Sequence, residues 1–212
     1  FITSGMRADW ITVAVRTGEA GAKGAGGVSM IVVPGNAPGL HRTELKKMGW
    51  WCSDTAHLRF DNVRVPAENL LGGPAMENRG FICLMEQPPW ERLQIAIQAV
   101  AAIEAALEHT LAYVKERKAF GKAIIDFQNT RFKLAEIKTR ATAVRLMVDQ
   151  YLAEHMRRKL TIEEAAIAKL YCTEELGKCL DELLQLYGGY GYMTEYPIAR
   201  AFADARVQRI YG

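Results

Sequence analysis

The spacing of apolar residues changes near residue 74, and this change divides the chain into two regions. Before residue 74, short runs rich in β-branched residues alternate with turn residues. Three of these runs predict strands, over residues 10–15, 28–33 and 55–60. A glycine-rich loop over residues 18–27 leads into the second run. We therefore expect residues 1–73 to form part of an antiparallel β-sandwich or barrel.

After residue 74 the apolar residues recur every three or four positions, which is the period of an amphipathic helix. Three long helices and a shorter fourth are predicted, over residues 88–114, 134–151, 161–187 and 197–207. Pro88 suits the first turn of its helix, and Thr161 with Glu164 is a capping-box pair. Long helices joined by short loops favour an antiparallel bundle. The predicted fold class is α+β, a partial antiparallel β-domain (1–73) followed by an antiparallel four-helix bundle (74–212).

Composition narrows the function classes. The chain has 212 residues and a net charge of only +3, which gives no case for nucleic-acid binding. No uninterrupted apolar run reaches the ~20 residues of a membrane span, and no signal peptide is visible. The four cysteines show no CxxC spacing and no nearby histidine cluster, so neither a metal site nor a disulfide framework is expected. These features predict a soluble intracellular protein.

Glu91 lies in the first turn of the helix predicted over residues 88–114, directly after Pro88, Pro89 and Trp90. One interpretation is structural, because acidic residues complement the positive end of a helix dipole. The other is a general base, presented beside aromatic and proline surface that excludes water. Partial burial would raise the pKa of such a carboxylate and make it a better proton acceptor.

Two other segments also allow two interpretations. The basic run over residues 116–122 suits a helix C-terminus capped by Gly121, and it also suits a phosphate clamp built on Arg117. The glycines of the segment over residues 186–192 can stop a helix, and they can also let the backbone approach a bound cofactor.

Taken in order, these segments resemble the acyl-CoA dehydrogenase family along essentially the whole chain. The matching segments are Phe-Ile-Thr-Ser-Gly at 1–5, Lys-Met-Gly-Trp at 47–50, Ser-Asp-Thr at 53–55, Phe-Asp-Asn-Val-Arg-Val-Pro at 60–66, Asn-Leu-Leu-Gly at 69–72, Glu-Arg-Leu at 91–93, Arg-Lys-Ala-Phe-Gly at 117–121, Phe-Gln at 127–128, Gly-Gly-Tyr-Gly-Tyr at 188–192, Glu-Tyr-Pro at 195–197, Asp-Ala-Arg at 204–206 and Ile-Tyr-Gly at 210–212. The resemblance implies the second half of the family's middle β-domain over 1–73. It also implies most of the C-terminal helical domain over 74–212, which is expected to continue beyond Gly212.

The resemblance implies a flavoenzyme of fatty-acid β-oxidation. FAD is the expected cofactor, and an acyl-CoA thioester is oxidised to a trans-2-enoyl-CoA, with the α proton passing to a carboxylate and a hydride passing to flavin N5. An electron-transfer flavoprotein is the expected acceptor. A homodimer or homotetramer sharing FAD across its interface is implied, in a bacterial cytoplasm or a mitochondrial matrix.

Residue roles also follow from the resemblance. Many members carry the base at the position of Gly212, whereas the long-chain and isovaleryl-type members carry it at the position of Glu91. The resemblance therefore implies that Glu91 is the catalytic base, flanked by the substrate-binding candidates Trp90 and Arg92. The implied FAD-binding residues are Phe1, Ile2, Thr3, Arg117, Phe120, Gln128, Gln185, Leu186, Gly188 and Gly189.

Two other functions remain open at this point. An acyl-CoA oxidase or another flavoenzyme of the same fold would differ in the access of oxygen to reduced flavin. A non-catalytic paralogue that binds acyl-CoA is the second alternative, and the presence of Glu91, Thr3 and Arg117 argues against it.

Overall fold

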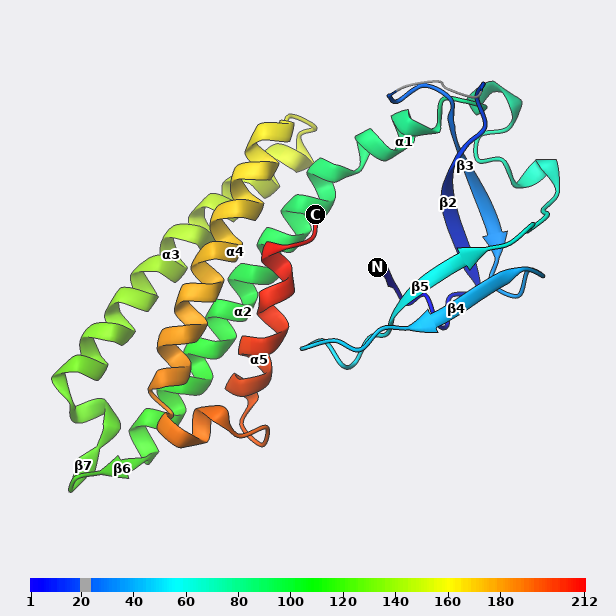
Figure 1. Ribbon diagram of the computed structural model, residues 1–212. Helices are drawn as coiled ribbons and strands as arrows, with labels where there is room; N and C mark the ends of the chain where they lie inside the picture. Colours follow the sequence, from blue (N-terminus) through cyan, green and yellow to red (C-terminus); the bar gives the residue numbers. More distant parts are fainter. Residues whose placement is uncertain (20–23) are drawn as a thin grey trace. The chain divides into compact units, whose positions relative to one another are not determined.

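The computed structural model describes residues 1–19 and 24–212, so part of the predicted glycine-rich loop, residues 20–23, lies outside the described residues. The chain forms two compact units, Phe1–Gln87 and Pro88–Gly212 (Figure 1). The predicted class, antiparallel sheets followed by a helical domain, is confirmed. The predicted boundary between residues 73 and 74 stays a prediction.

The first unit contains two antiparallel sheets. Its strands are β1 (Ile2–Thr3), β2 (Trp10–Arg16), β3 (Val28–Pro34), β4 (Leu40–Glu44) and β5 (Thr55–Phe60). Strands β2 and β3 pair with each other, and β5 lies between β1 and β4. The three predicted runs become β2, β3 and β5. Strand β4 (Leu-His-Arg-Thr-Glu) was not predicted, because it has little apolar character.

Three short helical segments complete this unit: the 3-10 turns η1 (Ala67–Asn69) and η2 (Pro74–Met76), and helix α1 (Gly80–Glu86). Helix α1 packs against β3. The apolar spacing did not predict α1. The apolar residues of this helix do not form a buried stripe, since Phe81, Ile82, Leu84 and Met85 remain exposed.

The second unit is a helical bundle. Its elements are α2 (Pro88–Glu116), β6 (Lys118–Ala119), β7 (Lys122–Ala123), η3 (Ile124–Asp126), α3 (Gln128–Met156), α4 (Ile162–Gln185), η4 (Gly188–Tyr192), α5 (Pro197–Ala205) and η5 (Arg206–Arg209). Helix α2 packs against α3, α4 and α5 (Figure 1). All four predicted helices form. The capping box is also confirmed, since the Thr161 hydroxyl accepts from the Glu164 N–H and Glu164 accepts from the Thr161 N–H.

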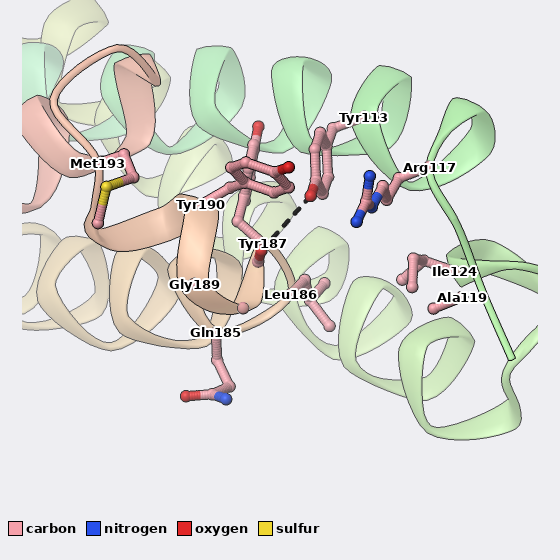
Figure 2. Close-up of a pocket in the computed structure, with 11 residues that line it drawn as sticks. Tyr113, Arg117, Ala119, Ile124, Gln185, Leu186, Tyr187, Gly189, Tyr190 and Met193 are labelled. Atoms are coloured by element: carbon pink, nitrogen blue, oxygen red, sulfur yellow. Dashed lines mark hydrogen bonds between the residues drawn. The ribbon is translucent and has the colours of Figure 1, made fainter.

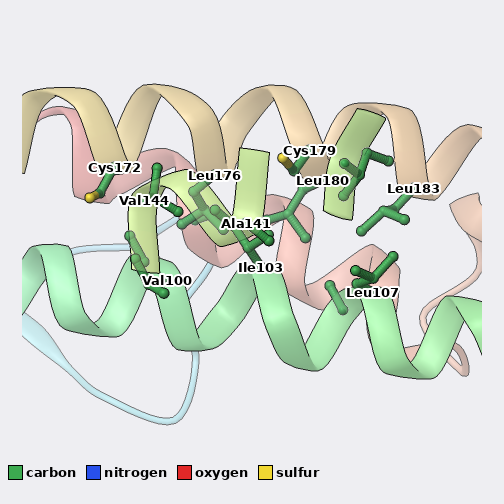
Figure 3. Close-up of a cluster of buried hydrophobic side chains, with 14 of the residues drawn as sticks. Val100, Ile103, Leu107, Ala141, Val144, Cys172, Leu176, Cys179, Leu180 and Leu183 are labelled. Carbon is green, nitrogen blue, oxygen red and sulfur yellow. The ribbon is translucent and has the colours of Figure 1, made fainter. Parts of the chain in front are cut away.

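The core of the bundle comes from the inward faces of the three long helices (Figure 3). Leu93, Ile103, Ile137, Leu176 and Leu180 are among its fully buried side chains. Burying such a side chain contributes about 1.5–3 kcal/mol, so this interface supplies the main stabilisation of the unit.

Two thiols belong to the same core. The cysteines are free, as expected, and Cys172 and Cys179 are buried in α4. Burial raises the pKa of Cys172 to about 12 and that of Cys179 to about 11. Both groups therefore remain protonated at neutral pH and act as small apolar side chains.

One helical stretch, Gly80–Glu116, is long and apolar enough to cross a membrane, judged by length and composition alone. The sequence analysis expected no such stretch because it considered only uninterrupted apolar residues. The finding carries little weight, since the core helix of a soluble protein passes the same test.

Candidate functional site

A pocket of about 640 Å³ lies at the end of α2 in the helical unit (Figure 2). It is lined from the last turn of α2, the β6 strand, η3 and the segment that follows α4. The lining residues are Tyr113, Arg117, Ala119, Ile124, Gln185, Leu186, Tyr187, Gly188, Gly189, Tyr190 and Met193. Five residues that the sequence analysis assigned to FAD therefore meet at one place, although up to 72 positions separate them.

Tyrosines form one wall of this pocket. The Tyr113 and Tyr187 rings stack with centroids 4.0 Å apart, and Tyr196 meets both rings edge-on. The Tyr113 hydroxyl donates to the Tyr187 carbonyl oxygen over 3.4 Å (Figure 2). Burial raises the pKa of Tyr113 and of Tyr187, so both phenols stay neutral. The wall is thus a rigid, uncharged aromatic surface.

Tyr187 and Tyr190 lie in the glycine segment over residues 186–192 that the sequence pointed to, whereas Tyr113 was not identified from the sequence. Tyr113 is one helical turn before Arg117, and Tyr187 and Tyr190 flank the glycine pair. Their spacing to predicted site residues was a usable signal, because residues four apart on a helix share a face. The same spacing, however, also suits residues of a bundle core.

Arg117 and the glycines give the pocket its polar character. The Arg117 guanidinium lies 5.0 Å from the Tyr190 ring centroid, and no carboxylate of the described residues forms a salt bridge with Arg117. A Cβ built on Gly188 or Gly189 would have no other atom within 4 Å, so the backbone is open there. A cation without an acidic partner, open backbone and flat aromatic surface fit an anionic dinucleotide such as FAD.

Phe120 and Gln128 do not line the pocket. Phe120 is 96% exposed in the turn between β6 and β7, with a positive φ of 53°. Its ring meets Phe127 edge-on at 6.4 Å. Gln128 is the exposed first residue of α3. A side chain as apolar and exposed as Phe120 is typical of a contact surface.

The remaining FAD candidates are Ile2 and Thr3, which form β1 of the first unit, and Phe1, which precedes it; all three are exposed. Asp54 holds the turn after this strand. Its carboxylate accepts from the Met6 N–H at 2.7 Å and pairs with Arg7 at 3.1 Å. Its carbonyl oxygen accepts from the Ser4 N–H at 3.0 Å. Asp54, which lies in the matched segment Ser-Asp-Thr at 53–55, therefore supports the segment that carries Thr3.

At the other end of α2, Glu91 lies in the first turn and is exposed. The partial burial expected from the sequence is therefore not provided by the described residues of this chain. The preceding residue, Trp90, is half-buried and stacks on His155 in the last turn of α3, with ring centroids 4.3 Å apart.

Position 212 lies close to the same part of α2. A Cβ built on Gly212 would be 2.5 Å from Cδ1 of Ile95, which is one turn beyond Glu91. The same Cβ would be 3.6 Å from Cε of Lys169. Burial and the charge of Arg92 lower the pKa of Lys169. Gly212 and Lys169 therefore lie near the first turns of α2, the part of the helix that carries Arg92.

Among the residues that the structure describes, no group of three or more His, Cys, Asp or Glu side chains is placed to hold a metal ion.

The chain belongs to the acyl-CoA dehydrogenase family. The family model described as acyl-CoA dehydrogenase, C-terminal domain, matches residues 78–212, and the one described as acyl-CoA dehydrogenase, middle domain, matches residues 1–63. This result agrees with the resemblance expected from the sequence.

Individual relatives are similar over the full chain. It is 44% identical to the long-chain specific mitochondrial acyl-CoA dehydrogenase of Mus musculus, covering 100% of this chain and 49% of that protein. It is 37% identical to the short-chain specific acyl-CoA dehydrogenase of Megasphaera elsdenii, covering 100% of this chain and 54% of that protein. The crystal structure of acyl-CoA dehydrogenase from Geobacillus kaustophilus matches with a TM-score of 0.93 and 44% identity, covering 99% of this chain and 55% of that one. The chain thus spans about half the length of these relatives.

Proposed function

We propose that the protein carrying this chain dehydrogenates an acyl-CoA thioester between its α and β carbons, giving a trans-2-enoyl-CoA. The observation that carries the proposal is the helical unit itself, in which α2 presents a carboxylate at its first turn and the Arg117 pocket at its last. Membership of the family supports acyl-CoA as the substrate class.

Glu91 is the proposed base that removes the α proton. Its carboxylate is exposed at the start of α2, where an incoming thioester can reach it. In this proposal the bound substrate, rather than the described residues, covers the carboxylate and excludes water. The resemblance implies a base at position 91 or at position 212. Gly212 has no acidic side chain, so Glu91 is the carboxylate that this chain offers.

FAD is the proposed cofactor, and when bound it accepts the hydride that leaves the β carbon. Arg117, Gly188 and Gly189 would hold it through charge and open backbone, and the tyrosine wall would offer a flat surface to its rings. Gln185, Leu186, Phe120 and Gln128 would make further contacts. Phe1 and the β1 residues Ile2 and Thr3 would contact the flavin ring.

Partners and location follow the same proposal. In this proposal Arg117, Phe120, Gln128 and the 185–189 segment contact the FAD of a neighbouring subunit in a homodimer or homotetramer, and the exposure of Phe120 and Gln128 supports such a contact. An electron-transfer flavoprotein is the proposed electron acceptor in fatty-acid β-oxidation. The proposed location is a bacterial cytoplasm or a mitochondrial matrix.

The test uses the intact protein that carries this chain. We expect it to purify yellow and its flavin absorbance to bleach when a saturated acyl-CoA is added without oxygen. Glu91→Gln should retain the flavin and slow bleaching at least about 100-fold, because it removes the proton acceptor. The matched control is Glu108→Gln, an exposed glutamate further along α2.

Normal bleaching by Glu91→Gln would show that Glu91 is not the base. A wild-type protein without flavin would favour the non-catalytic paralogue. Hydrogen peroxide formed at the rate of turnover would favour the oxidase.

A further inference from the structure

We propose that His155 is a positioning residue that fixes Trp90 beside the base and thereby sets the fit of the acyl chain. This inference rests on the proposed function, because it concerns the site that Glu91 defines. It concerns two side chains of the helical unit and depends on no contact with the first unit.

The stack between Trp90 and His155 is close and well aligned. Their ring centroids are 4.3 Å apart and the ring planes differ by 10°. Trp90 belongs to the first turn of α2, while His155 belongs to the last turn of α3. The contact therefore joins the ends of two antiparallel helices, at the position immediately before the candidate base.

The start of α2 needs such an anchor. Pro88 and Pro89 have no backbone N–H, so the first turn has fewer donors with which to bind neighbouring groups. The helix assignment is also interrupted at Gln87, between α1 and α2, although its backbone stays in the α-helical region. Helix ends fray unless they are held. The stack restrains the side-chain rotation of Trp90 and the turn that carries Glu91.

The contact is separate from the bundle core. Both rings are half-buried, and neither residue belongs to the set of fully buried side chains. His155 covers one face of the indole, and Trp90, one position before Glu91, remains partly exposed. An acyl chain is an apolar ligand that fits such a surface. The geometry thus assigns His155 to specificity through Trp90, with no direct contact to the reacting carbons.

The experiment compares His155 variants of the intact protein. We expect His155→Ala to raise KM for a saturated acyl-CoA about three- to tenfold, the range of one aromatic pair, with kcat within about twofold. His155→Phe keeps a stacking ring and should restore KM. His155→Leu, which has volume but no ring, should behave as His155→Ala. The matched control is His109→Ala, an exposed histidine in α2.

A second readout is independent of turnover. Subtracting the fluorescence emission of the Trp90→Phe variant from that of the unsubstituted protein gives the emission of Trp90. His155→Ala and His155→Leu should shift this emission to the red and make it easier to quench with acrylamide, whereas His155→Phe should not.

The two proposals fail in different ways. If Trp90 emission and KM are both unchanged in His155→Ala and His155→Leu, the positioning role is wrong. If Trp90 loosens as expected but KM does not change, the stack is only structural and the inference is overturned. If the wild type never turns over acyl-CoA, the proposed function is wrong, and the claim of a specificity role falls with it.

Discussion

The two ends of α2 differ in how much of a site this chain builds. At the last turn, Tyr113 and Arg117 face a pocket whose tyrosine wall is held by stacking and a hydrogen bond. At the first turn, Glu91 is exposed, and its half-buried neighbour Trp90 stacks on His155. The pocket end is pre-organised, whereas the base end offers a reactive group without enclosing it. A cofactor-binding surface must be rigid before binding, but a base can be enclosed when substrate arrives.

The largest expected effect is at Arg117. Arg117→Ala should weaken flavin binding by the intact protein at least about tenfold, because it removes a charged planar donor group from the pocket. Arg117→Lys should be intermediate, since an ammonium keeps the charge but not the fork. Flavin retention after dialysis, followed by its absorbance, measures the loss.

Lys115→Ala is the matched control for Arg117, because it removes an exposed cation that does not line the pocket. If Glu91→Gln lost the flavin while Arg117→Ala retained it fully, the roles assigned to the two ends of α2 would be reversed.

The glycine pair tests the pocket end more finely. Gly188 has a φ of +57°, so Gly188→Ala should lower the free energy of unfolding by about 1 kcal/mol. Gly189 has no positive φ and open space around it, so Gly189→Ala should leave thermal unfolding unchanged and reduce flavin affinity several-fold. Unaltered affinity in Gly189→Ala would mean that the backbone does not approach the cofactor.

The middle of α2 should show the smallest effect. The Arg145 Nε atom donates to Glu104 over 3.0 Å, and this hydrogen bond lowers the pKa of Glu104. Because that pKa is depressed, the stabilisation is present above the unfolded value of about 4.3 and is lost as pH falls through the folded value. Solvent screens this partly exposed pair, so Glu104→Gln should cost at most about 0.5–1 kcal/mol at pH 7.

Denaturant unfolding at pH 7 and pH 3 measures that cost. An equal loss of stability for Glu104→Gln at both pH values would argue against an ionic contribution.

The sequence predicted the long helices well because their apolar stripes are also their buried faces. Leu93, Val100 and Leu107 of α2 were placed in such a stripe and are buried. The same logic did not identify β4, whose residues bury little, or α1, whose apolar side chains stay exposed. Periodicity reports burial, and elements without a buried face give no periodic signal.

The site was predictable in a different way. Arg117, Gln185 and Gly188 came from the resemblance to the family, and the structure brings them to one pocket. Tyr113 was missed because an aromatic at helical spacing is also what a core requires. The stack of Trp90 on His155 joins residues of two helices, and such a contact has no local signature in a single sequence.

The distribution of thiols has a practical consequence for labelling. Cys172 and Cys179, the thiols of the helical unit, are buried and protonated, while Cys52 is exposed in the first unit. A maleimide dye added to the folded protein should therefore mark Phe1–Gln87 and spare Pro88–Gly212. A fluorophore can therefore be attached to one unit alone. Energy transfer from this fluorophore to a bound flavin would report the distance between the two.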